Sequence, residues 1–158
     1  MVKYINTGVV FQEIPRETTL SINISGCPCH CPGCHSKYLW ENTGTDLSID
    51  EINKFVEKYD GLVTCICFMG GDAEPEYINY LANYIRNNFK DLKIGWYSGK
   101  DTISNKINIQ NFDYIKIGPY IESCGGLDKE TTNQKLYKII NNTLEDITFE
   151  FHKKHHFN

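Results

Sequence analysis

The chain lacks the segments that would place it in or across a membrane. No apolar run approaches the ~20 residues that span a bilayer. The amino-terminal residues do not combine a basic start, a long apolar stretch and a small-residue cleavage site. We therefore expect a cytoplasmic protein without a membrane partner.

Arginine and dense positive charge are also scarce. Arg16 and Arg86 are the only two arginines, the net charge is −4, and the lysines form no dense run. Proteins that bind nucleic acids usually carry clustered Lys and Arg side chains. We therefore expect no nucleic-acid partner.

The cysteine count argues against a disulfide framework. The chain of 158 residues contains seven cysteines, an odd number, and four of them are crowded together. A chain of this length can bury roughly 70% of its unfolded surface, which is enough for a core without disulfides. We expect a single domain over residues 1–158, with a histidine-rich tail from about residue 152. Metal binding is the remaining explanation for the cysteines.

The most informative segment has four cysteines and two histidines in nine positions: Cys27, Cys29, His30, Cys31, Cys34 and His35. Among them, Cys27, Cys31 and Cys34 have the spacing C-x3-C-x2-C. This spacing supplies three thiolates to a cubane iron–sulfur cluster and leaves its fourth iron without a protein ligand. Thiolates suit both iron–sulfur clusters and zinc.

Apolar patterning predicts alternating strands and helices. Strands are predicted at 20–24, 62–69, 93–97 and 114–117, a further strand is possible at 147–151, and helices are predicted at 47–59 and about 75–89. Ser48 and Glu51 have the spacing of a helix capping box, and Gly61 fits a helix stop. The run at 62–69 is typical of a strand that is buried on both faces.

This alternation favours parallel strands joined by crossovers, with their carboxyl ends at one rim. The segments expected at that rim are the cysteine loop, Gly70-Gly71-Asp72, Tyr97-Ser98-Gly99 and Gly118-Pro119. Because the chain is too short for eight βα units, we expect an α/β fold in the form of a partial, open (β/α) barrel with mostly parallel strands.

Two of these segments resemble motifs of a known superfamily. The cysteine loop, residues 26–34, is similar to the cluster loop of radical S-adenosylmethionine enzymes. Gly70-Gly71-Asp72 resembles their Gly-Gly-Glu motif, with aspartate where glutamate is usual. Within that superfamily, Tyr97-Ser98-Gly99 and the segments 113–120 and 131–134 resemble the activating proteins of anaerobic ribonucleoside-triphosphate reductase. The similarity covers about residues 8–137.

The resemblance implies a radical S-adenosylmethionine oxidoreductase that activates a glycyl-radical enzyme. It carries one [4Fe-4S] cluster, which a reduced flavodoxin or a similar donor supplies with an electron. Reductive cleavage of S-adenosylmethionine then gives a 5′-deoxyadenosyl radical. That radical takes a hydrogen from a glycine of the partner, the large subunit of the reductase.

The resemblance also implies roles for individual residues. The cluster ligands are Cys27, Cys31 and Cys34, and no catalytic side chain is expected beyond the cluster. The residues expected to bind S-adenosylmethionine are Gly70, Gly71, Asp72, Tyr97, Ser98, Asn133 and Gln134.

Other interpretations of the same residues stay open at this point. One is another small radical enzyme of the superfamily, either a different glycyl-radical enzyme activase or a deazapurine synthase. Another is a zinc-binding interaction module built on the cysteine loop. Cys29 is expected not to bind iron, Cys65 and Cys67 to be buried as small apolar side chains, and Cys124 to be a free thiol in a loop. His152, His155 and His156 are expected in a solvated tail.

Overall fold

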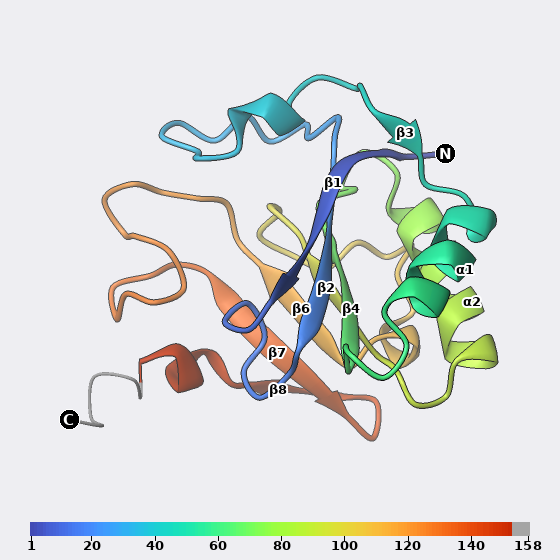
Figure 1. Ribbon diagram of the computed structural model, residues 1–158. Coiled ribbons are helices and arrows are strands. Elements are labelled where there is room, and N and C mark those ends of the chain that lie inside the picture. Colours follow the sequence, from blue (N-terminus) through green and yellow to red (C-terminus); the bar gives the residue numbers. More distant parts are fainter. Residues whose placement is uncertain (153–158) are drawn as a thin grey trace.

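A computed structural model describes residues 1–152, and its centre is one sheet (Figure 1). The strands are β1 (Lys3–Val10), β2 (Thr19–Ile24), β3 (Thr45–Asp46), β4 (Cys65–Met69), β5 (Lys93–Tyr97), β6 (Tyr114–Ile117), β7 (Lys135–Ile140) and β8 (Thr143–Asp146). The α-helices of the described residues are α1 (Ile49–Lys58) and α2 (Pro75–Asn88). Short 3₁₀ turns are η1 (Lys37–Leu39), η2 (Ile109–Asn111) and η3 (Thr148–Phe151).

The sheet is mixed, and this corrects the predicted barrel. The strand order is β3-β1-β2-β4-β5-β6-β7-β8. The central strands β2, β4, β5 and β6 are parallel, whereas the four pairs β3/β1, β1/β2, β6/β7 and β7/β8 are antiparallel. The prediction of a partial (β/α) barrel with mostly parallel strands is therefore wrong.

Two antiparallel additions explain the difference. At one edge, β1 precedes β2 and pairs with it, so no crossover helix is needed. At the other edge, β7 and β8 form a hairpin in which Ile140 pairs with Thr143. The two residues between them, Asn141 and Asn142, have φ of 50° and 61°. Asparagine tolerates this left-handed backbone, and two such residues form the tight turn that matches the twist of a hairpin.

The predicted elements of the central part are present with small shifts. Ser48 caps α1 by accepting a hydrogen bond from the Glu51 backbone N–H at 3.2 Å. Pro75 lies in the first turn of α2, where a missing N–H costs nothing. The strand predicted at 62–69 begins at Cys65, because Leu62 lies in an exposed turn. The possible strand at 147–151 is wrong, since residues 148–151 form η3.

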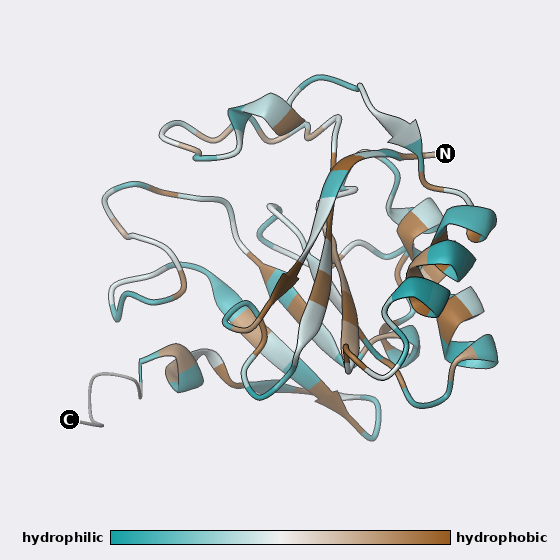
Figure 2. Ribbon diagram, viewed as in Figure 1, coloured by the Kyte–Doolittle hydropathy of each residue, from teal (hydrophilic) through white to brown (hydrophobic). Residues whose placement is uncertain are grey.

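Apolar side chains cover both faces of the central strands. Both α-helices lie on one side of the sheet and turn their apolar sides toward it (Figure 2). Ile66 and Phe68 of β4 belong to the core on this face. Cys65 and Cys67 of the same strand belong to a second core on the opposite face. The prediction that this strand is buried on both faces is therefore confirmed.

No helix in residues 1–152 is long and apolar enough to cross a membrane. His155 and His156 of the predicted tail lie outside the described residues. His152 is described, and its Nε2 lies 3.0 Å from the carbonyl oxygen of Leu127.

Candidate metal centre

The cysteine loop leaves the carboxyl end of β2 and is closed at its base by backbone hydrogen bonds. The Gly26 N–H donates to the Glu41 carbonyl at 3.1 Å, and the Cys27 N–H donates to the Leu39 carbonyl at 2.9 Å. Leu39 is buried and belongs to η1. The cysteines therefore lie on a loop outside the sheet, and backbone hydrogen bonds hold the two ends of this loop side by side.

Two local contacts shape the interior of this loop. The imidazole of His30 stacks on the indole of Trp40, with ring centroids 4.6 Å apart and planes 7° from parallel. The Cys34 N–H donates to the Cys31 carbonyl at 3.1 Å, which makes a tight turn between two predicted ligands. The Ser36 N–H lies 3.3 Å from the Cys34 sulfur. Hydrogen bonds of this kind to sulfur tune iron–sulfur clusters.

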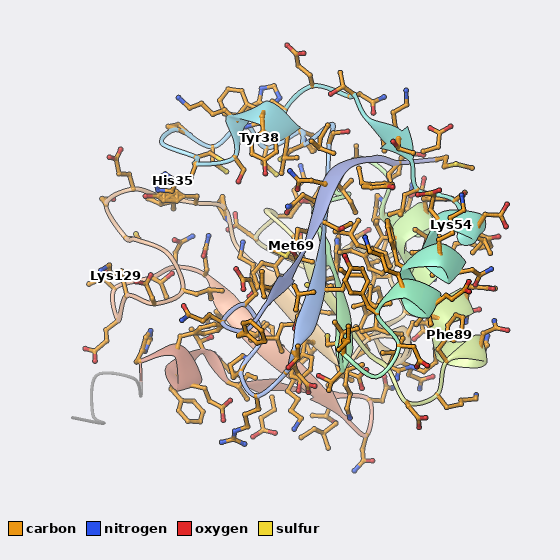
Figure 3. All side chains as sticks on the ribbon, viewed as in Figure 1. His35, Tyr38, Lys54, Met69, Phe89 and Lys129 are labelled. Carbon is orange, nitrogen blue, oxygen red and sulfur yellow. The ribbon has the colours of Figure 1, made fainter. Side chains whose placement is uncertain are left out.

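The tip of the loop lies beside the segment that follows β6 (Figure 3). The rings of His35 and Tyr120 are 5.7 Å apart. Gly33 has φ of +79°, and a Cβ there would lie 3.2 Å from a carboxylate oxygen of Glu122. The two segments border an open groove of about 530 Å³ lined by Pro32, Tyr120, Ile121, Glu122 and Ser123.

Asp72 connects the cysteine loop to the ends of β4 and β5. Its carboxylate accepts hydrogen bonds from the Ser98 hydroxyl at 2.5 Å and from the Gly99 N–H at 2.8 Å. The Cys29 sulfur lies 3.9 Å from the same carboxylate. The structure thus brings Asp72 and Ser98, both expected to bind S-adenosylmethionine, into direct contact beside the cysteines.

Gly70 and Gly71 form the turn that delivers Asp72. Their φ angles are 116° and 94°, a region that favours glycine. The Gly70 carbonyl accepts a hydrogen bond from the Trp96 indole N–H at 2.7 Å. A Cβ on Gly71 would lie 2.5 Å from carbons of the buried Ile78 side chain. Both glycines are therefore required by the backbone and by packing.

Cys29 lies between Asp72 and Gly99, where a Cβ on Gly99 would approach its sulfur to 2.8 Å. Burial, together with the neighbouring charges of Asp72 and Cys27, raises the pKa of Cys29 to about 12. A raised pKa disfavours the thiolate, which is the form that binds metal. That Cys29 does not bind iron stays a prediction.

The remaining predicted site residues lie at the same rim with different contacts. The Tyr97 hydroxyl donates to the Glu13 carbonyl, so its ring is fixed against the second core. The Asn133 amide donates to the Pro119 carbonyl at 3.0 Å, and its own carbonyl oxygen is buried with no hydrogen-bond partner among residues 1–152. Gln134 packs against Gly118 at the end of β6. The rim therefore includes Asn133 and Gln134 just before β7.

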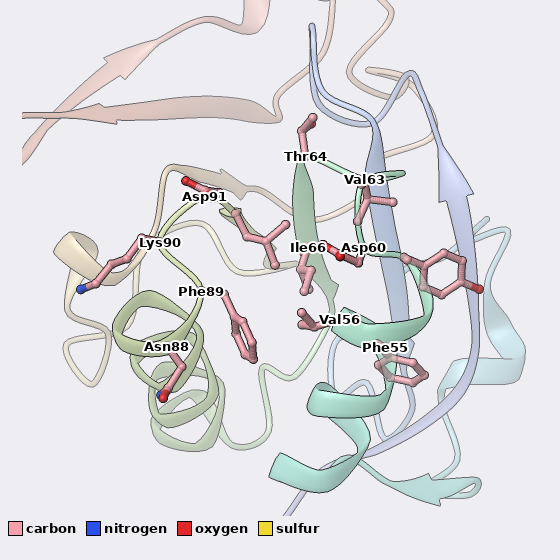
Figure 4. Close-up of a pocket in the computed structure, with 13 residues that line it drawn as sticks. Phe55, Val56, Asp60, Val63, Thr64, Ile66, Asn88, Phe89, Lys90 and Asp91 are labelled. Carbon is pink, nitrogen blue, oxygen red and sulfur yellow. The ribbon is translucent and has the colours of Figure 1, made fainter.

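The other cysteines lie away from the loop. Cys65 and Cys67 are fully buried, as expected, and burial raises the pKa of both thiols. Cys124 is a partly exposed free thiol in a loop. A pocket of about 680 Å³ lies at the opposite, amino-terminal end of β4, between the ends of the two α-helices (Figure 4). Its apolar lining includes Phe55, Val56, Ile66 and Phe89.

Sequence analysis did not single out Lys116, which the strand register places beside the site. The pairings put Asn23, Met69, Tyr97, Lys116 and Leu136 in one row across the sheet. The Lys116 ammonium donates to the carbonyls of Ser98 at 3.1 Å and Gly118 at 2.8 Å, and Lys116 is only 8% exposed. A lysine inside a buried strand was the available signal.

Burial lowers the pKa of Lys116 from 10.5 to about 8, although the charges of Asp72, Cys31, Cys29 and Cys27 act in the opposite direction. The unfolded chain therefore binds more protons than the folded chain between about pH 8 and 10.5. The contribution of Lys116 to the free energy of unfolding rises with pH across this window. The full change is about 3 kcal/mol.

This pH dependence is measurable in the metal-free, reduced protein. We expect Lys116→Met to gain free energy of unfolding relative to the wild type at pH 7 and to lose this relative gain toward pH 10. Urea unfolding of both proteins at several pH values gives the difference, which cancels the titration of the tyrosines and cysteines. A difference that does not change with pH would contradict the buried charge.

The donor set fits an iron–sulfur cluster in its chemistry. Cys27, Cys31 and Cys34 are reduced and partly exposed. In residues 1–152, no group of three or more His, Cys, Asp or Glu side chains is close enough together to hold a single metal ion. A cubane binds each thiolate through a different iron, so its ligands stand apart around the cluster.

The comparison with protein families decides between iron–sulfur and zinc. A family model described as the 4Fe-4S single cluster domain matches residues 16–140, which include the cysteine loop and the rim. The chain belongs to the 4Fe-4S single cluster domain family. Neither the curated proteins nor the solved structures contain a match. Membership of this family favours an iron–sulfur cluster over zinc at the cysteine loop.

Proposed function

We propose that this cluster-domain protein is a radical S-adenosylmethionine enzyme that activates anaerobic ribonucleoside-triphosphate reductase by forming a glycyl radical on its large subunit. One observation carries the proposal: the cysteine loop lies in contact with the carboxylate of Asp72. The two motifs are 43 positions apart in the chain. Their contact at one rim is what an enzyme that joins a cluster to a bound ligand requires.

In this proposal Cys27, Cys31 and Cys34 hold a [4Fe-4S] cluster. When bound, the cluster supplies the electron for reductive cleavage of S-adenosylmethionine. The three ligands lie on a loop that is closed at its base by backbone hydrogen bonds. Cys29 keeps its proton and its contact with Asp72.

The rim residues position S-adenosylmethionine in this proposal. Gly70 and Gly71 have no side chains that would keep a ligand away from their backbone. Asp72 is oriented by Ser98 and Gly99, so its carboxylate is fixed before an ammonium group arrives. The unpartnered carbonyl oxygen of Asn133 offers a further acceptor at the rim. A ligand with an amino group and several hydrogen-bond donors suits this set.

A protein substrate agrees with the surface beside the loop. Tyr38 after the cysteines is 51% exposed, and Ile121 across the groove is 40% exposed. These apolar side chains border the site, where the glycine-bearing segment of the large subunit would approach. A reduced flavodoxin or a similar protein is the proposed electron donor.

Reconstitution without oxygen tests the proposal. The reduced protein is incubated with S-adenosylmethionine and the large reductase subunit, and electron paramagnetic resonance records the glycyl doublet. We expect methionine release and a doublet that requires both proteins. Cleavage without a doublet on this partner would favour another glycyl-radical enzyme or a small-molecule substrate. An iron-loaded protein that does not cleave S-adenosylmethionine would overturn the proposal.

A further inference from the structure

Lys116 is a buried positive charge that the proposed ligand-binding roles leave unused. Its ammonium group has three N–H donors. Two of them reach the carbonyls of Ser98 and Gly118, and the ammonium lies 5.8 Å from the centre of the Tyr97 ring. Among the described residues, no carboxylate forms an ion pair with it. Carbonyl dipoles satisfy its donors but do not neutralise its charge.

Keeping such a charge inside a protein is unfavourable unless something anionic is nearby. Asp72 has the largest effect in favour of the charged form of Lys116, and Cys31 and Cys27 of the cysteine loop act in the same direction. Asp72 already accepts hydrogen bonds from Ser98 and Gly99. These hydrogen bonds do not remove the charge of Asp72, and thiolates that hold a cluster at the same rim add further negative charge.

The strand register explains why the charge of Lys116 lies near the cysteine loop although Lys116 belongs to β6. Lys116 pairs with Tyr97 of β5, and the next residue of β5, Ser98, holds both Asp72 and the ammonium. Asp72 in turn contacts the loop through Cys29. Lys116 is thus fixed to the same rim as the cysteines by hydrogen bonds from two strand ends, and it is shielded from solvent.

We propose that Lys116 supplies the counter-charge for the cluster held by Cys27, Cys31 and Cys34 and thereby raises its reduction potential. This inference rests on the proposed ligand set. Reduction adds one electron, and no proton, to a cluster that thiolates already make negative. A fixed positive charge stabilises the reduced form more than the oxidised form, and burial protects that effect from screening by salt.

The test is a redox titration of the reconstituted protein without S-adenosylmethionine, with mediator dyes supplying the electron. Lys116→Met and Lys116→Gln remove the charge, and Gln keeps a donor for the carbonyls. Lys116→Arg keeps the charge. The matched control is Lys93→Met, which removes an exposed lysine at the opposite end of β5. Iron and sulfide per chain are measured for every variant.

We expect the reduction equilibrium of both neutral variants to shift at least tenfold toward the oxidised form, which is about 59 mV for one electron. Lys116→Arg and Lys93→Met should stay near the wild type. Neutral variants that hold a full cluster at the wild-type potential would overturn the inference. So would a shift in Lys116→Met that Lys116→Gln does not share, because hydrogen bonding rather than charge would then explain it.

Loss of the cluster in the neutral variants also has a defined meaning. If Lys116→Arg keeps its iron while both neutral variants fold and lose theirs, the counter-charge is required for assembly, and the inference is supported. If Lys116→Arg also folds without iron, the shape of the side chain rather than its charge is what cluster binding requires, and the inference fails. None of these measurements needs S-adenosylmethionine cleavage. A negative result for the proposed function would therefore not decide the role of Lys116, and the reverse also holds.

Discussion

Replacing Cys31 with alanine is expected to reduce bound iron from about four per chain to near zero and to abolish S-adenosylmethionine cleavage. The same result is expected for Cys27→Ala and Cys34→Ala, because a cubane with three protein ligands has no spare thiolate. Iron and sulfide analysis after reconstitution without oxygen, together with the visible absorption of the brown protein, measures the loss.

Cys29→Ala is the matched control, since it removes a thiol from the same loop. Cys29 lies against Asp72 and falls outside the C-x3-C-x2-C spacing, so this variant is expected to keep its iron. Circular dichroism of all four metal-free variants checks that folding is unchanged. An iron-free Cys29→Ala protein, or a Cys31→Ala protein with a full cluster, would contradict the ligand assignment.

Gly71→Ala is expected to lower the free energy of unfolding by about 3 kcal/mol. The added Cβ would lie 2.5 Å from carbons of the Ile78 side chain, which is fully buried. Overpacking of a core typically costs about 1–3 kcal/mol. The φ of +94° adds about 1 kcal/mol for a residue with a Cβ. Urea unfolding of the metal-free protein gives the value.

Gly61→Ala separates the two contributions. Gly61 also has a positive φ, of +75°, but a Cβ there meets nothing within 4 Å. Only the backbone cost of about 1 kcal/mol is expected at this position. If the two variants were equally stable, crowding at Ile78 would not be the reason that glycine is required at position 71.

The elements that follow from hydrophobic periodicity were predictable. Ser48 and Pro75 mark the starts of α1 and α2 by local chemistry, so each helix begins within two residues of its prediction. The edge strands were not predictable, because β1 is only partly buried, β8 is exposed, and both lack a continuous apolar pattern. Asn141-Asn142 is a turn signal for the β7/β8 hairpin, which sequence analysis did not predict. The parallel arrangement was therefore extended to strands that are antiparallel.

The site was predictable where spacing carries the chemistry. The assignment of Cys27, Cys31 and Cys34 rests on their spacing and stays a prediction, whereas the contact of Asp72 with the cysteine loop follows from its place at the end of a parallel strand. Lys116 was missed because its role depends on register: only the alignment of β5 with β6 places it below Ser98. Pairing register between distant strands is a tertiary property that no local pattern reports.

The backbone bonds at the base of the cysteine loop separate folding from metal loading. Gly26 and Cys27 are tied to Glu41 and Leu39 by the chain itself, without any contribution from iron. Small zinc domains, by contrast, unfold when their metal is removed. We therefore expect the chain to keep its fold when oxygen destroys the cluster. Fresh iron and sulfide would then restore the protein, with no new synthesis of the chain.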